Sequence, residues 1–100
     1  MVEIEVPAAI GVATTDDTLT VDLSDGRTVS VPLAWYPRLL QASAQERGDW
    51  RVIGQGHGVH WEAIDEDISV ENLLAGHPSG ESQQSFERWL ASRKPSVAQS

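Results

Sequence analysis

The residues best suited to catalysis or metal binding lie in one short stretch of the chain. It holds two histidines and four acidic residues: His57, His60, Glu62, Asp65, Glu66 and Asp67. Imidazole nitrogens and carboxylates are common zinc ligands in proteins, so this stretch is the first candidate for a metal centre. However, residues three apart on a strand point to opposite faces, which separates His57 from His60. We therefore expect no metal and no other cofactor here.

The other reactive patterns lack the residue order that their chemistry requires. The acidic run does not follow the D-x-[DN]-x-[DN]-G order of a calcium loop, and we interpret it as a solvated turn. Gly54, Gly56 and Gly58 do not have the GxGxxG spacing of a nucleotide site, and no GxSxG nucleophile elbow occurs. The sequence therefore predicts a protein that is not an enzyme, with no catalytic or cofactor-binding residues.

The length and composition indicate one small domain. A chain of 100 residues holds a single hydrophobic core. The chain has no cysteine, which excludes disulfides and thiolate chemistry and is typical of a reducing cytoplasm. No apolar run approaches the roughly 20 residues that cross a bilayer, and Glu3 and Glu5 stand where a secretory signal needs basic residues. We expect a cytoplasmic protein that is not bound to a membrane.

The charge balance argues against nucleic acid as a direct partner. Fifteen acidic residues against seven basic ones give a formal net charge of −8. Affinity for nucleic acids comes largely from Lys and Arg side chains that neutralise phosphates, and this chain has no cluster of them. The acidic surface either keeps the protein soluble or faces a basic protein partner, and composition does not separate these two interpretations.

Alternating apolar residues predict a first β-hairpin near the N-terminus. A two-residue loop at positions 16–17 would place Val12 opposite Val21. The same loop would place Ile10 opposite Leu23. Every apolar side chain of this hairpin would then lie on one face.

The second turn of the predicted sheet can be tested by its register. A three-residue loop at positions 24–26 sets Val21 against Val29 and Leu19 against Val31. A loop one residue shorter would set a serine against Val21 and turn the third strand to the wrong face. The three-residue loop also ends on a glycine, which readily takes the left-handed conformation needed there. We therefore predict a three-stranded antiparallel meander.

The next segment predicts short helices. Pro37 is tolerated in a first helical turn, so a helix should begin near Tyr36 and carry Leu39 and Leu40 onto the sheet. A further helical turn follows, in which Ser43 and Glu46 have the spacing of a capping box.

A second hairpin and two closing helices complete the predicted fold. A tight loop at positions 55–56 pairs Val52 with Val59 and Trp50 with Trp61. Further along, Ser69 should cap a short helix that stops at Gly76, followed by a flexible linker up to Gly80. The last predicted helix, residues 82–93, carries three apolar residues at helical spacing: Phe86, Trp89 and Leu90.

The predicted fold class is thus α+β. It consists of an antiparallel three-stranded meander, a helix, a second β-hairpin and one or two short C-terminal helices. We expect a single α+β domain over residues 1–78, a C-terminal amphipathic helix over residues 79–94 and a flexible tail over residues 95–100.

Two segments, DGRTVSVPLAWYPRLLQA and GDWRVIGQGHGVHWEAIDEDISVENLLAG, resemble the small bacterial family of unknown function DUF2442. The resemblance extends over about residues 8–78 and includes the aspartate–glycine hairpin, the valine-rich strand, the Trp-Tyr-Pro helix entrance and the acidic IDEDISVENLL segment. Some relatives carry a helix-turn-helix unit after this domain, which residues 79–100 are too short to hold. Relatives are often encoded beside other tiny proteins, in arrangements like toxin–antitoxin pairs, and the resemblance implies such a partner.

The expected function is a non-catalytic, cytoplasmic protein-binding or regulatory module, an antitoxin-like member of a two-gene pair. Two alternatives stay open: a homodimeric structural or scaffolding domain, and a transcription-linked regulator that acts through a partner. The partner is accordingly a different protein or a second copy. Aromatic and apolar side chains at the helix entrance and on the last helix are the candidate partner-binding residues: Trp35, Tyr36, Phe86, Trp89 and Leu90. For Trp35 and Tyr36, packing in the core is the competing interpretation.

Overall fold

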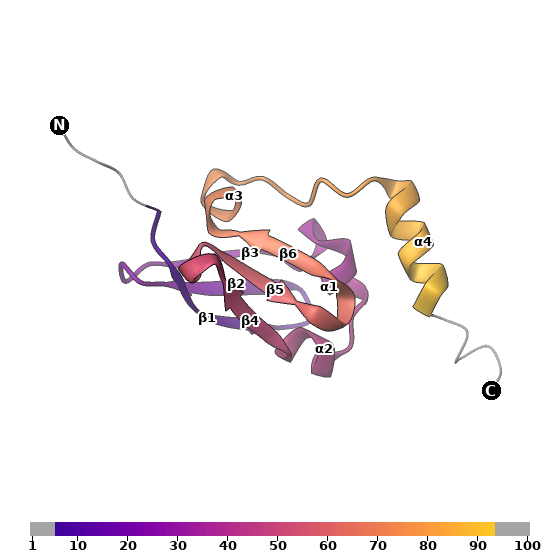
Figure 1. Ribbon diagram of the computed structural model, residues 1–100, viewed down its shortest axis with the longest axis horizontal. Helices are drawn as coiled ribbons and strands as arrows, with labels where there is room; N and C mark the ends of the chain where they lie inside the picture. Colours follow the sequence, from indigo (N-terminus) through magenta and orange to yellow (C-terminus); the bar gives the residue numbers. More distant parts are fainter. Residues whose placement is uncertain (1–5, 94–100) are drawn as a thin grey trace.

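The computed structural model describes residues 6–93, which form two antiparallel sheets around one core (Figure 1). The first sheet contains β1 (Ala9–Thr14), β2 (Thr18–Leu23) and β3 (Thr28–Pro32). The second sheet contains β4 (Trp50–Ile53), β5 (Gly58–Trp61) and β6 (Glu66–Ser69). The α-helices are α1 (Pro37–Gln41), α2 (Ala44–Gly48), α3 (Val70–Ala75) and α4 (Gln83–Arg93). Single 3-10 turns are η1 (Leu33–Trp35), η2 (Gly54–Gly56) and η3 (Glu62–Ile64). The predicted α+β class is confirmed.

The two sheets face each other and share their apolar side chains (Figure 1). β2 and β5 are the central strands of their sheets. Leu19 and Val21 from β2 join Val59 and Trp61 from β5 in one core cluster, and each is at most 1% exposed. No helix of residues 6–93 is long and apolar enough to cross a membrane.

The predicted strand registers are mostly confirmed. In the first sheet Val12 pairs with Val21, and Val21 also pairs with Val29. The three-residue turn closes with Gly26 at φ +94°, the left-handed conformation expected there. In the second sheet Trp50 pairs with Trp61, as predicted for a loop at positions 55–56.

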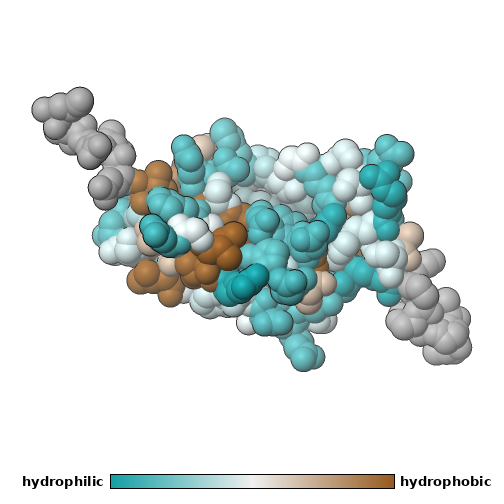
Figure 2. Space-filling model, viewed as in Figure 1, coloured by the Kyte–Doolittle hydropathy of each residue, from teal (hydrophilic) through white to brown (hydrophobic). Residues whose placement is uncertain are grey.

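One predicted pair is wrong: Ala9, not Ile10, lies opposite Leu23. The register shifts between Ala9 and Gly11, where β1 has a bulge. A bulge adds one residue without a partner to one strand, and here that residue is Ile10. Its side chain therefore faces away from the core. Ile10 is consequently 64% exposed. Figure 2 shows apolar surface gathered at the end of the molecule where β1 begins.

The helix entrance also departs from the prediction at one leucine. η1 precedes α1, which begins at Pro37 with Tyr36 as its N-cap residue. A helix of five residues turns only one narrow face to the sheet, and Leu39 occupies it. Leu40 is 38% exposed and does not pack into the core as expected.

The caps that the sequence indicates are present. Ser43 and Glu46 form a capping box at α2, in which the Ser43 hydroxyl accepts from the Glu46 N–H. The Ser69 hydroxyl accepts from the Asn72 N–H at the start of α3, and Gly76 ends this helix at φ +78°. Polar caps therefore define the ends of helices that are too short to persist alone.

The acidic run, which we interpreted as a solvated turn, contains a strand instead. β6 pairs with β5 and adds a third strand to the expected second hairpin. Its residues alternate between buried and more accessible positions, beginning with buried Glu66 and exposed Asp67. Pairing with β5 satisfies the backbone polar groups of this segment.

Leu39 and Leu40 provide a matched test of the fold. Leu39→Ala should lower the free energy of unfolding by about 2–5 kcal/mol, because it opens a cavity in the core. Leu40→Ala should cost less than about 1 kcal/mol. Urea unfolding followed by tryptophan fluorescence measures both values. Equal losses in the two variants would contradict the observed placement of the two leucines.

Candidate functional site

The two neighbouring histidines do not converge on one site. His57 is exposed in the turn that follows η2, while His60 lies on β5. The His60 ring pairs with Asp67 through Nδ1 and lies 2.9 Å from a Glu62 oxygen through Nε2. Hydrogen bonds to Asp67 and Glu62 raise the pKa of His60. Across residues 6–93 no three His, Asp or Glu side chains are arranged to hold a metal ion.

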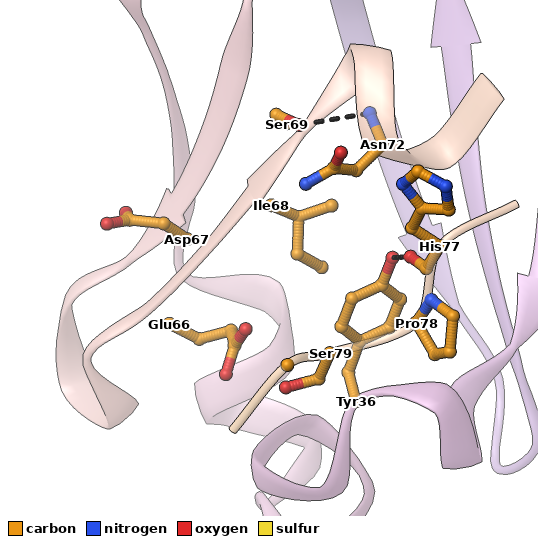
Figure 3. A pocket seen from close by; sticks show the side chains of 10 residues that line it. Tyr36, Glu66, Asp67, Ile68, Ser69, Asn72, His77, Pro78 and Ser79 are labelled. Atoms are coloured by element: carbon orange, nitrogen blue, oxygen red, sulfur yellow. Dashed lines mark hydrogen bonds between the residues drawn. The ribbon is translucent and has the colours of Figure 1, made fainter. Parts of the chain in front are cut away.

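A buried carboxylate occupies the inner face of the second sheet. Glu66 begins β6 and is only 9% exposed, in the same inward phase as buried Ile68. Asp67 between them points outward (Figure 3). The period of two along a strand therefore carries an acidic side chain to the apolar side.

The Glu66 side chain lines a small pocket of about 100 Å³ (Figure 3). The pocket lies between β6, the start of α3, the Tyr36 ring and the linker that leaves α3. Its lining residues are Tyr36, Glu66, Asp67, Ile68, Ser69, Asn72, His77, Pro78, Ser79 and Gly80. In Figure 3 the Glu66 carboxylate is turned toward the side of the pocket formed by Tyr36 and Ser79.

The linker over this pocket is tied to the domain at two points. The Tyr36 hydroxyl donates to the His77 carbonyl at 3.4 Å. The Ser79 N–H donates to the Trp35 carbonyl at 2.9 Å. The linker that we predicted to be flexible is thus hydrogen-bonded to the helix entrance.

Burial dominates the ionisation of Glu66. It raises the pKa of this carboxyl group to about 7, because removal from water disfavours the charged form. The positive charge of Arg38 opposes this shift, and the negative charges of Glu81, Asp67 and Asp65 add to it. Burial also raises the pKa of Tyr36 to about 12, with a smaller contribution from the charge of Glu66.

Sequence reasoning missed Glu66 although a signal was present. In IDEDISV the residues Ile64, Ile68 and Val70 recur with a period of two, and Glu66 has the same phase. All three apolar residues are buried. Four acidic residues between positions 62 and 67 made the segment look like a solvated turn and concealed the strand pattern.

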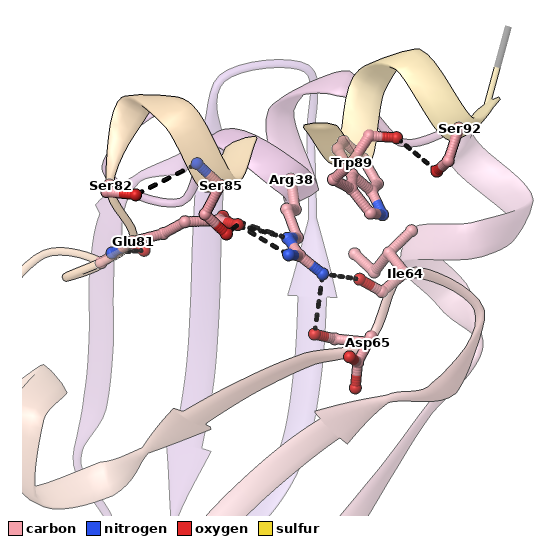
Figure 4. A network of polar contacts seen from close by, with 9 residues as sticks. Arg38, Ile64, Asp65, Glu81, Ser82, Ser85, Trp89 and Ser92 are labelled. Carbon is pink, nitrogen blue, oxygen red and sulfur yellow. Dashed lines mark hydrogen bonds and ion pairs between the residues drawn. The ribbon is translucent and has the colours of Figure 1, made fainter. Parts of the chain in front are cut away.

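Arg38 joins α1 to the C-terminal segment and to the turn before β6 (Figure 4). Its guanidinium donates to both Glu81 oxygens, with the shortest contact at 2.6 Å. A further nitrogen donates to the carbonyls of Ile64 and Asp65 at 3.0 and 3.2 Å. Glu81 also accepts from the Ser85 hydroxyl. Hydrogen bonds from Arg38 hold the pKa of Glu81 below its usual value.

A second ion pair holds the other end of α4. Arg93 donates to both oxygens of Glu46, at 2.8 and 3.1 Å. The guanidinium carbon of Arg93 lies 4.5 Å from the centroid of the Trp89 ring, and that of Arg38 lies 5.2 Å from it. The Glu46–Arg93 ion pair and the contact of Arg38 with the Trp89 ring therefore attach α4 to the domain, and the Arg38–Glu81 pair anchors the segment just before the helix.

The five predicted partner-binding residues fall into two groups. Tyr36 is buried and lines the pocket, while Trp35 is half-buried and packs against the core. On α4, Phe86 stacks on Trp89 with a centroid distance of 5.9 Å. Phe86, Trp89 and Leu90 are all half-buried. Arg38 connects the groups, because it belongs to the helix that Tyr36 caps and lies over Trp89.

The buried carboxylate predicts an unusual pH dependence of stability. The pKa of Glu66 rises from 4.5 to about 7 on folding, so the folded protein binds more protons than the unfolded chain in that range. This contribution to stability is complete below pH 4.5 and is lost as the pH rises through about 7. Between pH 5 and 8, the wild type should lose about 2–3 kcal/mol more unfolding free energy than Glu66→Gln.

Urea unfolding at both pH values measures this difference. His60 is present in both the wild type and the variant. The difference between their stability–pH profiles therefore reports the contribution of Glu66. Glu71→Gln, which removes an exposed carboxylate from α3, is the matched control and should follow the wild-type profile. Parallel profiles for wild type and Glu66→Gln would exclude a buried, poorly solvated Glu66.

The attachment of α4 leads to a second prediction. Glu81→Gln should weaken the contact with Arg38 and speed amide exchange in α4 at least tenfold, because a charged hydrogen bond contributes about 1.5–3 kcal/mol. The core should remain stable to within about 1 kcal/mol. Glu87→Gln is the control, since within residues 6–93 Glu87 bonds only to Gln83 of the same helix. Unchanged exchange in Glu81→Gln would show that the ion pair does not hold α4.

Comparison with solved structures yields two similar folds. A crystal structure of a protein of unknown function from Rhodospirillum rubrum has a TM-score of 0.65 and 30% identity, covering 77% of this chain and 95% of that one. A solution NMR structure of an uncharacterized protein from Chromobacterium violaceum has a TM-score of 0.63 and 18% identity. It covers 81% of this chain and 74% of that one, and it supports the fold alone.

The family comparison agrees with the resemblance that the sequence indicated. No curated protein matches the chain significantly. The family model described as "Protein of unknown function (DUF2442)" matches residues 9–79, close to the expected range 8–78. This match covers the meander, the helix entrance, the second sheet and α3. The chain therefore belongs to the DUF2442 family.

Proposed function

We propose that this chain is a non-catalytic protein-binding module with a regulatory role, and that α4 is its principal contact element. The observation that carries the proposal is the exposure of α4. None of its residues is buried, although it holds Phe86, Trp89 and Leu90. A helix whose own domain leaves its apolar residues only half-buried is suited to lie in the groove of a partner.

The mode of attachment supports this role. Charged side chains, Arg38 with Glu81 and Arg93 with Glu46, hold α4 against the domain. In the part of the chain that the structure describes, Trp89 is the one hydrophobic residue of α4 that packs against the core cluster. Phe86 and Leu90 thus retain apolar surface that a partner can cover without displacing the core.

The chemistry of the partner follows from charge. The chain carries a formal net charge of −8, so two copies repel each other while a basic surface is attracted. We therefore propose a different protein as the occupant, with an apolar groove bordered by basic residues. Because relatives are often encoded beside other tiny proteins, the product of the neighbouring gene is the first candidate, and the chain would be the antitoxin-like member of that pair. We place this pair in the cytoplasm, where a chain without cysteine needs no disulfide.

A binding experiment tests the proposal. The purified chain is titrated with the purified product of the neighbouring gene by calorimetry. The double variant Phe86→Ala/Leu90→Ala should bind at least tenfold more weakly, because apolar residues central to an interface contribute about 1.4 kcal/mol or more. Its thermal melt should stay close to that of the wild type, since neither side chain is buried. Arg88→Ala, an exposed change on the same helix, should bind like the wild type.

Three outcomes would contradict parts of the proposal. Equal affinity in the wild type and the double variant would exclude α4 as the contact element. No binding of the neighbouring protein would exclude the two-gene pair. A wild type that sediments as a dimer, and a double variant that sediments as a monomer, would favour the homodimeric scaffold instead.

A further inference from the structure

The pocket beside β6 contains a carboxylate without a partner. Glu66 is 9% exposed, and within residues 6–93 its carboxylate takes part in no hydrogen bond or ion pair. Its remaining accessible surface faces the pocket, toward Tyr36 and Ser79 (Figure 3). A buried carboxylate normally has a cation or several donors beside it, because burial without them is costly.

Arg38, the cation whose charge acts on Glu66, does not fill this role. The Arg38 guanidinium is engaged by both oxygens of Glu81 and by the carbonyls of Ile64 and Asp65 (Figure 4). The charges that act on Glu66 are one guanidinium, Arg38, and three carboxylates, Glu81, Asp67 and Asp65. The excess of negative charge favours a cationic ligand in the pocket.

The size and lining of the pocket narrow the choice of cation. A volume of about 100 Å³ holds an ammonium group and a short alkyl stem, since one water occupies about 30 Å³ of liquid. The Tyr36 ring, Ile68 and Pro78 supply apolar walls for such a stem. The Tyr36 hydroxyl oxygen offers the ammonium group a second hydrogen-bond acceptor beside the Glu66 carboxylate. A calcium ion would need six to eight oxygen ligands, which a single buried carboxylate does not supply.

We propose that this pocket binds a primary alkylammonium group, of the kind that a lysine side chain presents, with the Glu66 carboxylate as its charge partner. The ammonium supplies the donors that Glu66 lacks. The inference goes beyond the proposed function, because it involves the pocket under the 77–80 linker and not α4. The group can come from a lysine of a protein or from a free diamine, and the two sources share this chemistry.

Two amine probes and one neutral probe test the inference on the full chain. Nα-acetyl-lysine methylamide represents a protein lysine, cadaverine represents a free diamine, and Nα-acetyl-norleucine methylamide has a similar stem without charge. Each is titrated at pH 8, above the pKa of about 7 for Glu66, and amide shifts are followed by NMR. We expect saturable shifts at Ile68, Asn72 and Ser79 with at least one amine and none with the neutral probe.

The variants separate this inference from the proposed function. Glu66→Gln should weaken amine binding at least tenfold, because a charged hydrogen-bond partner is lost. Glu71→Gln, which removes an exposed carboxylate from α3, should bind like the wild type. Phe86→Ala/Leu90→Ala should also keep full affinity, so failure of the α4 proposal leaves this one intact. The amide spectrum of each variant reports whether it is folded.

Either of two results would overturn the inference: no saturable shifts with either amine, or equal amine affinity in the wild type and a folded Glu66→Gln. If the lysine probe binds at least as tightly as cadaverine, a protein lysine is the natural occupant. If cadaverine binds at least tenfold more tightly, the ligand is a free diamine. Both of these results support an ammonium pocket.

Discussion

The alternation of side chains along β2 and β5 is the constraint on which the structure depends. Each central strand turns every second residue toward the opposite sheet, so Leu19 and Val21 meet Val59 and Trp61 in one core. A slip of one residue in either strand would exchange these side chains for polar ones. The same period explains the candidate site, because it carries Glu66 of β6 to the inner side with Ile68. A rule that builds the core thus also places a carboxylate at its edge.

Arg38 links this core to the C-terminal segment. Its stem starts on α1, beside Leu39 in the core, and its guanidinium reaches Glu81, the turn before β6 and the Trp89 ring. A planar group with five donors can serve several acceptors at once, which a lysine ammonium cannot do in the same geometry. One side chain therefore positions α4 and fixes the start of β6. Its positive charge also offsets part of the negative potential at Glu66.

The two proposed binding sites of this chain differ in chemical character. The Phe86–Leu90 surface of α4 is apolar and half-buried, and its helix is held mainly by charged contacts that water and salt can weaken. The pocket at Glu66 is small and acidic, and a hydrogen-bonded linker borders it. An acidic chain with these two features is suited to a basic partner, because apolar contact supplies affinity and opposite charge supplies orientation. Membership in the DUF2442 family agrees with the fold and leaves this function to be tested.

Local patterns in the sequence determined the strands of the meander, the turn at positions 24–26, the Trp50–Trp61 pair and the caps at Ser43, Ser69 and Gly76. These features follow from residues that are neighbours in sequence. The strand period, the turn residues and the helix caps were therefore enough to predict them. Only the tertiary structure decided the bulge that exposes Ile10, the pairing of β6 with β5, the burial of Glu66 and the docking of α4. The contacts that dock α4 join residues about forty or more positions apart, such as Arg38 with Glu81 and Glu46 with Arg93. The bulge and β6 are closer in sequence, but whether Ile10 faces water and Glu66 faces the core depends on how the two sheets pack together. That packing is a property of the whole chain, which no local pattern records.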